Sequence, residues 1–149
     1  MIIDSHCHLN YEPMSLSLKE TIDRANKDGV KYLLTISTED KSYDKILNII
    51  SKNECVYGSY GIHPHEAKNH QSIKSEDIIK KTELNKKIIG IGESGLDFYY
   101  NHSDKKDQIK CFEEHIIAAQ NTQLPLIVHT RNAETETLEI LFTKIEDDN

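Results

Sequence analysis

VKYLLTISTEDKSYDKILNIISKNECVYGSYGI, residues Val30–Ile62, contains a strand-like run at each end and a helix-like pattern between them. The apolar side chains of Tyr43, Ile46, Leu47 and Ile50 recur at the spacing of one helical face. A strand, a helix and a second strand in this order are typical of the βαβ unit of a parallel sheet.

The same alternation continues on both sides of this unit. Further strand-like runs lie at residues 2–4, 88–92 and 126–128, and helical spacing lies at residues 18–25, 76–84, 109–119 and 138–145. Strands therefore recur roughly every 25 to 35 residues with a helix between each pair. The sequence predicts an α/β fold with a parallel sheet of five strands, in a single domain over residues 1–149.

Composition excludes several classes of protein. The 149 residues include 18 basic and 25 acidic ones, for a net charge of −7, which argues against a protein that coats DNA without regard to sequence. It does not exclude a nuclease whose bound metals supply local positive charge. The three cysteines form no CxxC pair, so neither a zinc ribbon nor a disulfide framework is indicated. Without a signal segment or an apolar run of bilayer length, we expect a cytoplasmic protein with no membrane contact.

The segment Asp4-Ser5-His6-Cys7-His8 at the end of the first strand suggests a metal site. Side chains alternate between the faces of a strand, so Asp4, His6 and His8 lie on one face. Two imidazoles at i and i+2 can converge on one metal ion. The alternative is two polar residues on a half-exposed strand.

Polar clusters also follow the third, fourth and fifth strands. They comprise His63-Pro64-His65, then Glu93 with Asp97, then His129-Thr130-Arg131. In parallel α/β folds, active sites lie at the carboxyl ends of the strands, so we expect these clusters to meet there.

His6, His8, Glu93 and His129 together form a nitrogen–oxygen ligand set that suits Zn²⁺, Mn²⁺ or a similar divalent ion. Two ions roughly 3.5–4 Å apart can stabilise the attacking and leaving oxygens of a phosphodiester. The side chains of His63, His65 and Arg131 would then bind phosphate oxygens, the arginine through bidentate hydrogen bonds.

Each of these residues also has a purely structural interpretation. His63 can shape a turn with Pro64, Arg131 can pair with Glu134 or Glu136, and Glu93 can cap a loop amide. Asp97 can bind its own backbone, as loop aspartates often do. His129 can be a core histidine with satisfied hydrogen bonds.

Four ordered segments resemble the motifs of TatD-type metal-dependent hydrolases, which are TIM-barrel deoxyribonucleases of the amidohydrolase superfamily. The segments are MIIDSHCHLN, GIHPHEA, IGESGLDFYY and PLIVHTRNAETETLEIL. The resemblance runs from residue 1 to the end of the chain, and it implies a TIM-barrel type (βα)n fold.

The resemblance also implies roles for individual residues. It makes His6 and His8 ligands of one metal, Glu93 the catalytic carboxylate shared by two ions, and His129 a ligand of the second ion. His63, His65, Arg131 and Asp97, the last in the GLD motif, fall where the family lines its substrate pocket. The implied activity is hydrolysis of DNA phosphodiesters, from single strands or 3′ ends, with two divalent ions, Mg²⁺ first and Mn²⁺ or Zn²⁺ as the others.

The chain departs from this family in length. A complete barrel has eight βα units in about 250 residues, whereas five units are predicted here. The family's further metal-site residues, a histidine after the sixth strand and an aspartate after the eighth, have no counterpart. We therefore expect about the first five units, with two open sheet edges. There are three alternatives to an active nuclease. The chain is an inactive fragment of a truncated or split gene, it is completed by a separate C-terminal fragment, or it is a hydrolase of small C–N or C–O substrates.

Overall fold

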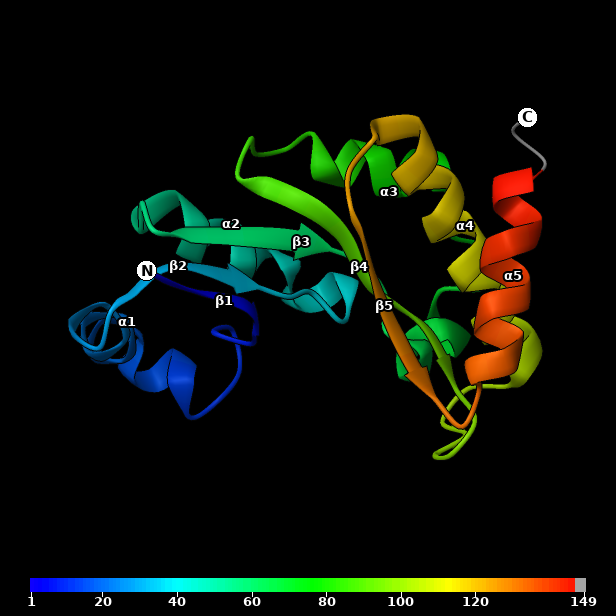
Figure 1. The fold of residues 1–149 in the computed structure, drawn as a ribbon, viewed down its shortest axis with the longest axis horizontal. Coiled ribbons are helices and arrows are strands. Elements are labelled where there is room, and N and C mark those ends of the chain that lie inside the picture. Colours follow the sequence, from blue (N-terminus) through cyan, green and yellow to red (C-terminus); the bar gives the residue numbers. More distant parts are fainter. Residues whose placement is uncertain (147–149) are drawn as a thin grey trace.

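Five parallel β-strands, each followed by an α-helix, make up the part of the chain that the computed structural model describes, residues 1–146 (Figure 1). The strands are β1 (Ile2–Cys7), β2 (Val30–Thr35), β3 (Val56–Tyr60), β4 (Ile88–Asp97) and β5 (Leu126–Arg131). The helices are α1 (Leu18–Lys27), α2 (Tyr43–Lys52), α3 (Ser75–Thr82), α4 (Lys105–Thr122) and α5 (Glu134–Glu146).

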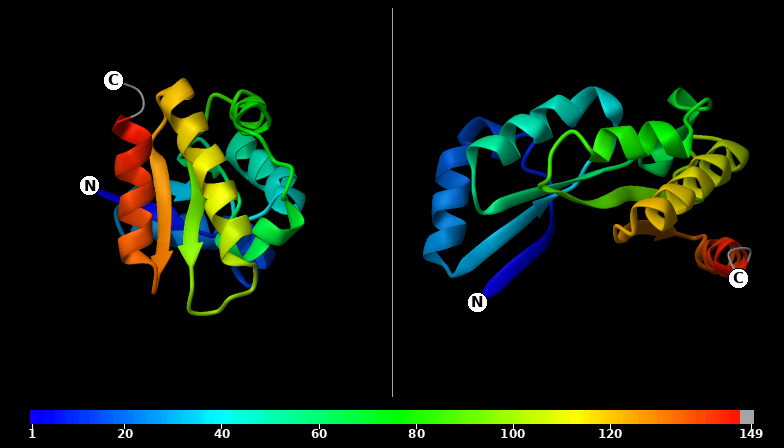
Figure 2. Two further views of the ribbon diagram at one scale, coloured as in Figure 1. Left: turned by 90° about the vertical axis from the view of Figure 1, so that its right-hand side faces the viewer. Right: turned by 90° about the horizontal axis from the view of Figure 1, so that it is seen from above.

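The sheet has the order β1-β2-β3-β4-β5, and every neighbouring pair is parallel. It is curved, and the helices follow its outer side (Figure 2). This is the arrangement of part of a TIM barrel, so the predicted fold class of five βα units is confirmed.

The core lies between the sheet and the helices. In α2 the side chains of Ile46, Ile49 and Ile50 are buried, which explains the helical spacing of apolar residues in this segment. Gly58 of β3 allows this helix to pack closely, because a Cβ atom there would lie 2.9 Å from side-chain carbons of Ile46 and Ile88.

β4 and β5 extend further than the apolar pattern predicted. The prediction placed Glu93 and Asp97 after the fourth strand and His129 after the fifth, but all three lie within strands. The reason is that the pairing of β4 with β5 continues past the apolar residues, with Gly95 opposite His129 and Asp97 opposite Arg131. Backbone pairing thus keeps Asp97 and His129 in regular strand positions, whereas Glu93 lies at an irregularity of the pairing between Gly92 and Ser94.

β1 and β5 are the edge strands of this sheet, as expected. Apolar side chains are exposed near both edges, including Ile3 (56%) in β1 and Val128 (39%) in β5. On α5, Leu138 and Phe142 are also more than half exposed. Among residues 1–146, no helix combines the length and the apolar character that a membrane crossing requires.

Candidate metal centre

The four predicted ligands come together, although Glu93 lies in the middle of β4 and not at its carboxyl end. His6, His8 and Glu93 place one nitrogen or oxygen atom each within 4.8 Å of the others, and so do His63, Glu93 and His129. The structure therefore brings β1, β4 and β5 to one site, and it adds His63 from the segment after β3. Their role as ligands stays a prediction.

The first group contains both histidines of the opening motif. Nε2 of His6 lies 3.4 Å from Oε2 of Glu93, and the rings of His6 and His8 are 5.2 Å apart. Nδ1 of His8 lies 3.2 Å from the carbonyl oxygen of Ile36, which can only accept a hydrogen bond. Neutral His8 therefore carries its proton on Nδ1 and has a lone pair on Nε2.

The second group is centred on His129. Its Nδ1 lies 3.0 Å from Oε1 of Glu93 and 3.3 Å from Nε2 of His63. Its Nε2 lies 3.2 Å from Oδ2 of Asp97. The hydrogen bond to Glu93 raises the pKa of His129, against the opposing effect of burial.

Glu93 connects the two groups, since one carboxylate oxygen faces His6 and the other faces His129. Burial alone would raise its pKa, but the hydrogen bond from His129 and the nearby imidazoles hold the pKa below its usual value. An ionised carboxylate between two sets of imidazole nitrogens fits divalent ions of the zinc and manganese type. The residues present thus suit the metal site that the sequence predicts.

Glycines on β4 set the position of Glu93. At Gly95 the backbone φ is +148°, and a Cβ atom would lie 2.0 Å from the carbonyl oxygen of His129. Only glycine permits this approach, which holds β4 directly against β5. The backbone N–H of Glu93 donates to the carbonyl of Ser37 at 2.9 Å, which ties the residue to the segment after β2.

His63 lies immediately before a short 3₁₀ helix, Pro64–Asn69, and its Nδ1 accepts the backbone N–H of His65 at 3.2 Å. The proposed turn-forming role is therefore present alongside its contact with His129. Burial lowers the pKa of His63 to about 4, so the ring is neutral near pH 7.

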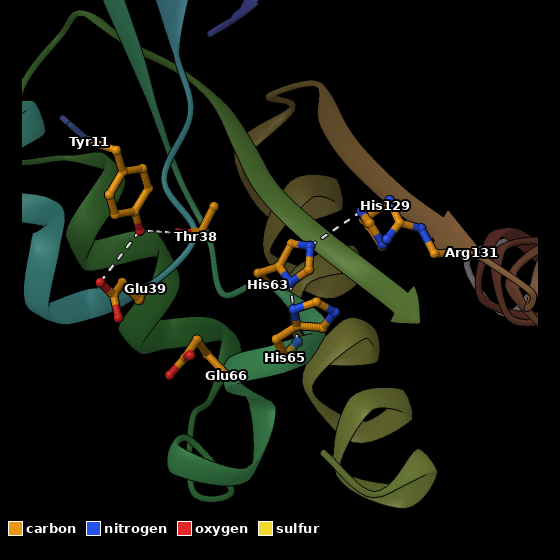
Figure 3. Close-up of a pocket in the computed structure, with 8 residues that line it drawn as sticks. All are labelled: Tyr11, Thr38, Glu39, His63, His65, Glu66, His129 and Arg131. Atoms are coloured by element: carbon orange, nitrogen blue, oxygen red, sulfur yellow. Dashed lines mark hydrogen bonds between the residues drawn. The ribbon is translucent and has the colours of Figure 1, made fainter. Parts of the chain in front are cut away.

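A cavity of about 380 Å³ opens beside this centre (Figure 3). It is lined by Tyr11, Thr38, Glu39, His63, His65, Glu66, His129 and Arg131. Three of the four predicted substrate-binding residues therefore line it, while Asp97 has no exposed surface and lies beneath His65 and His129.

The structure shows the backbone contacts that were the structural alternative for Asp97, but among the residues it describes it does not show the pairing with glutamate that was the alternative for Arg131. Oδ1 of Asp97 accepts the backbone N–H groups of Tyr99 and Tyr100 at 3.1 and 3.0 Å, as loop aspartates do. Arg131 lies 3.9 Å from Asp97 and over the ring of Tyr100, and within residues 1–146 no ion pair joins it to Glu134 or Glu136.

Sequence reasoning missed four cavity residues, Tyr11, Thr38, Glu39 and Glu66. Tyr11 lies three positions after His8, which is the one signal that pointed to it. Its hydroxyl is 2.5 Å from Oγ1 of Thr38 and donates to Glu39 at 3.4 Å (Figure 3). Thr38 and Glu39 follow β2, a strand after which the sequence shows no histidine motif.

A curved, parallel βα sheet that brings imidazoles and a carboxylate together is the arrangement of a TIM-barrel metal hydrolase site. The family model described as "TatD related DNase" matches residues 3–148. The chain belongs to this family, as the motifs indicated.

Individual relatives agree with this assignment. A protein of Buchnera aphidicola subsp. Baizongia pistaciae described as an uncharacterized metal-dependent hydrolase is 38% identical, over 94% of this chain and 53% of its own length. The 3′-5′ ssDNA/RNA exonuclease TatD of Citrobacter koseri is 29% identical, over 82% of this chain and 46% of its own length. The crystal structure of YjjV, a TatD homologue from Escherichia coli K12, superposes with a TM-score of 0.82 at 25% identity, over 91% of this chain and 53% of that one. The chain thus spans about half the length of the relatives it matches.

Proposed function

We propose that this chain forms the metal-binding half of a TatD-type hydrolase that cleaves DNA phosphodiester bonds from 3′ ends, using two divalent ions. One observation carries the proposal: the two oxygens of Glu93 face two separate groups of imidazole nitrogens. His6 and His8 would hold one ion, His129 would hold the second, and Glu93 would bind both. We expect the bound ions to be Mg²⁺, and Mn²⁺ and Zn²⁺ are the alternatives.

Divalent ions bound here would supply Lewis acidity to a water nucleophile and to the leaving oxygen. The chain's own residues would bind and orient the substrate. The guanidinium of Arg131 is about half exposed at the cavity and offers N–H donors that suit phosphate oxygens. His63 and His65 line the same cavity and add imidazole N–H donors. Tyr11 offers an aromatic surface at its rim, on which a nucleobase can stack.

We also propose that residues 1–149 act as one unit together with further βα units, from the same or from a separate polypeptide. A barrel of this type needs eight strands, and five are present in the described residues. The exposed apolar side chains at the edges of β1 and β5 support such a partner.

The test is cleavage of 3′-labelled single-stranded DNA with Mg²⁺ or Mn²⁺, by the chain alone and after addition of the C-terminal half of the Buchnera relative. We expect release of 3′ nucleotides, and a loss of at least about 100-fold in Glu93→Gln, because that change removes the shared charge. Glu20→Gln, on the exposed surface of α1, is the matched control and should cut at the normal rate. Failure of both preparations to cut DNA, or turnover of small amides or lactones instead, would contradict the proposal.

A further inference from the structure

A buried carboxylate lies beneath the candidate metal centre. Asp97 has no exposed surface, and its Oδ2 lies 2.8 Å from Nε2 of His65 and 3.2 Å from Nε2 of His129. Its Oδ1 is held by the backbone N–H groups of Tyr99 and Tyr100. The carboxylate is thus fixed in place and touches two imidazoles with a single oxygen.

This contact determines where His129 carries its proton. An ionised carboxylate only accepts hydrogen bonds, so Nε2 of His65 and Nε2 of His129 must both donate. Nδ1 of His129 also faces a carboxylate, Oε1 of Glu93 at 3.0 Å, so a ring that carries two protons donates at both nitrogens. A neutral imidazole has one N–H, and Nδ1 is the nitrogen that can accept instead, because Nε2 of His63 lies 3.3 Å from it. In the neutral ring the proton is therefore on Nε2, toward Asp97, and the lone pair is on Nδ1.

His63 has the opposite arrangement. Its Nδ1 accepts the backbone N–H of His65, so its neutral ring carries the proton on Nε2. That Nε2 lies 3.3 Å from Nδ1 of His129 and can donate to it. His63 is therefore close enough to Glu93 and His129 to share a metal ion with them, but the nitrogen that faces His129 carries a proton and has no lone pair for a metal.

We propose that Asp97 is a positioning residue that fixes the proton of His129 on Nε2, so that Nδ1 serves as the metal-binding atom while His63 acts as a hydrogen-bond donor and not as a ligand. This inference rests on the proposed metal centre. It gives the buried aspartate of the GLD motif a role through His129, in place of direct contact with substrate.

The decisive variant is Asp97→Asn. Its amide oxygen can still accept the N–H groups of Tyr99 and Tyr100, and this turns the amide NH₂ toward both imidazoles. The NH₂ group would donate to Nε2 of His129 and move the ring proton to Nδ1. We expect affinity for one of two Mn²⁺ ions to fall about 10- to 100-fold in a metal titration.

Ser103→Ala is the matched control. Ser103 donates to the carbonyl of His65 at 2.9 Å and accepts the N–H of Lys68, so it holds the same region without touching a ring nitrogen. Its loss should lower the melting temperature and leave both Mn²⁺ affinities unchanged. Equal loss of Mn²⁺ binding in Ser103→Ala and Asp97→Asn would overturn the inference, since loosening alone would then explain it. His63→Gln should retain both ions, and loss of an ion there would also overturn it.

Proton placement can be read directly in the metal-free chain. Long-range ¹H–¹⁵N spectra, recorded above the pKa of His129, should show its N–H at Nε2 in the wild type and at Nδ1 in Asp97→Asn. An N–H at Nδ1 in the wild type would refute the inference, even if the variant fails to fold. Because this readout needs no metal and no DNA cleavage, it separates failure of this inference from failure of the proposed function.

Discussion

At the scale of single residues, Glu93 is the group on which both halves of the candidate metal centre depend. Mn²⁺ at about 100 times its dissociation constant should stabilise the folded chain by about 2.7 kcal/mol per site, since the unfolded chain has no preformed site. Glu93→Gln should lose most of this gain, and Glu20→Gln should keep it. The measurement is the shift in melting temperature between chelator and Mn²⁺. A normal shift in Glu93→Gln would rule out this carboxylate as a shared ligand.

His115 is a buried residue that should make stability depend on pH. Its Nε2 accepts the backbone N–H of Ile62 at 3.0 Å, beside His63, and its Nδ1 donates to the carbonyl of Cys111. Burial lowers the pKa of His115 from 6.5 to about 4 in the folded chain. Between pH 6.5 and pH 4 the unfolded chain therefore binds more protons than the folded chain. The neutral His115 ring thus adds to the free energy of unfolding above about pH 6.5, and this stabilisation is lost as the pH falls toward 4.

Urea unfolding of the wild type and of His115→Gln at about pH 7.5 and pH 5 tests this dependence. The wild type should lose about 2 kcal/mol more than the variant on acidification. His63 also has a lowered pKa, but it is present in both proteins, so the difference between them isolates His115. Identical pH dependence in the two proteins would show that His115 does not titrate on unfolding.

At the scale of elements, the contact between β4 and β5 positions Glu93 against His129. Gly95→Ala should destabilise the chain by about 3 kcal/mol or more, because the added Cβ atom would lie 2.0 Å from a backbone oxygen of β5. Gly29→Ala is the control: its φ is +94°, but nothing lies within 4 Å of the added atom, so it should cost only about 1–2 kcal/mol. Similar urea midpoints for the two variants would contradict the importance of this contact.

The elements were predictable to different degrees. The five strands and five helices follow from their apolar spacing, as the buried face of α2 illustrates. The ends of β4 and β5 did not, because Asp97 stays in the ladder through pairing with Arg131 of β5, a long-range contact, and Glu93 lies at an irregularity of that pairing.

The proximity of the four predicted ligands could be predicted from the sequence, whereas their contacts and several residues of the adjoining cavity could not. Strand ends and residue types were enough to assemble His6, His8, Glu93 and His129. Strand alternation tells which face of a strand a side chain lies on, but it carries no information on the contacts that the side chain makes within a site. The burial of Asp97 beneath two imidazoles, and the presence of Thr38 in the cavity, therefore required the structure.

At the scale of the whole molecule, the two edge strands decide how the chain behaves in solution. Unpaired edges with exposed apolar side chains favour association, so the chain alone should sediment as mixed oligomers. Two copies would bring ten strands to a barrel that closes with eight, so a second copy does not complete it. The C-terminal half of the Buchnera relative should instead give a one-to-one complex. A stable monomer with a sharp, cooperative melt and no binding of that half would contradict this prediction.

The placement of His6 on β1 and of Glu93 on β4 has a mechanical consequence. These strands are separated in the sheet by β2 and β3, so they approach each other only because the sheet bends. An ion held by both would connect two points of an arc and oppose its flattening. Under the proposed metal binding, ion occupancy would therefore hold the sheet at the curvature that further strands need for ring closure.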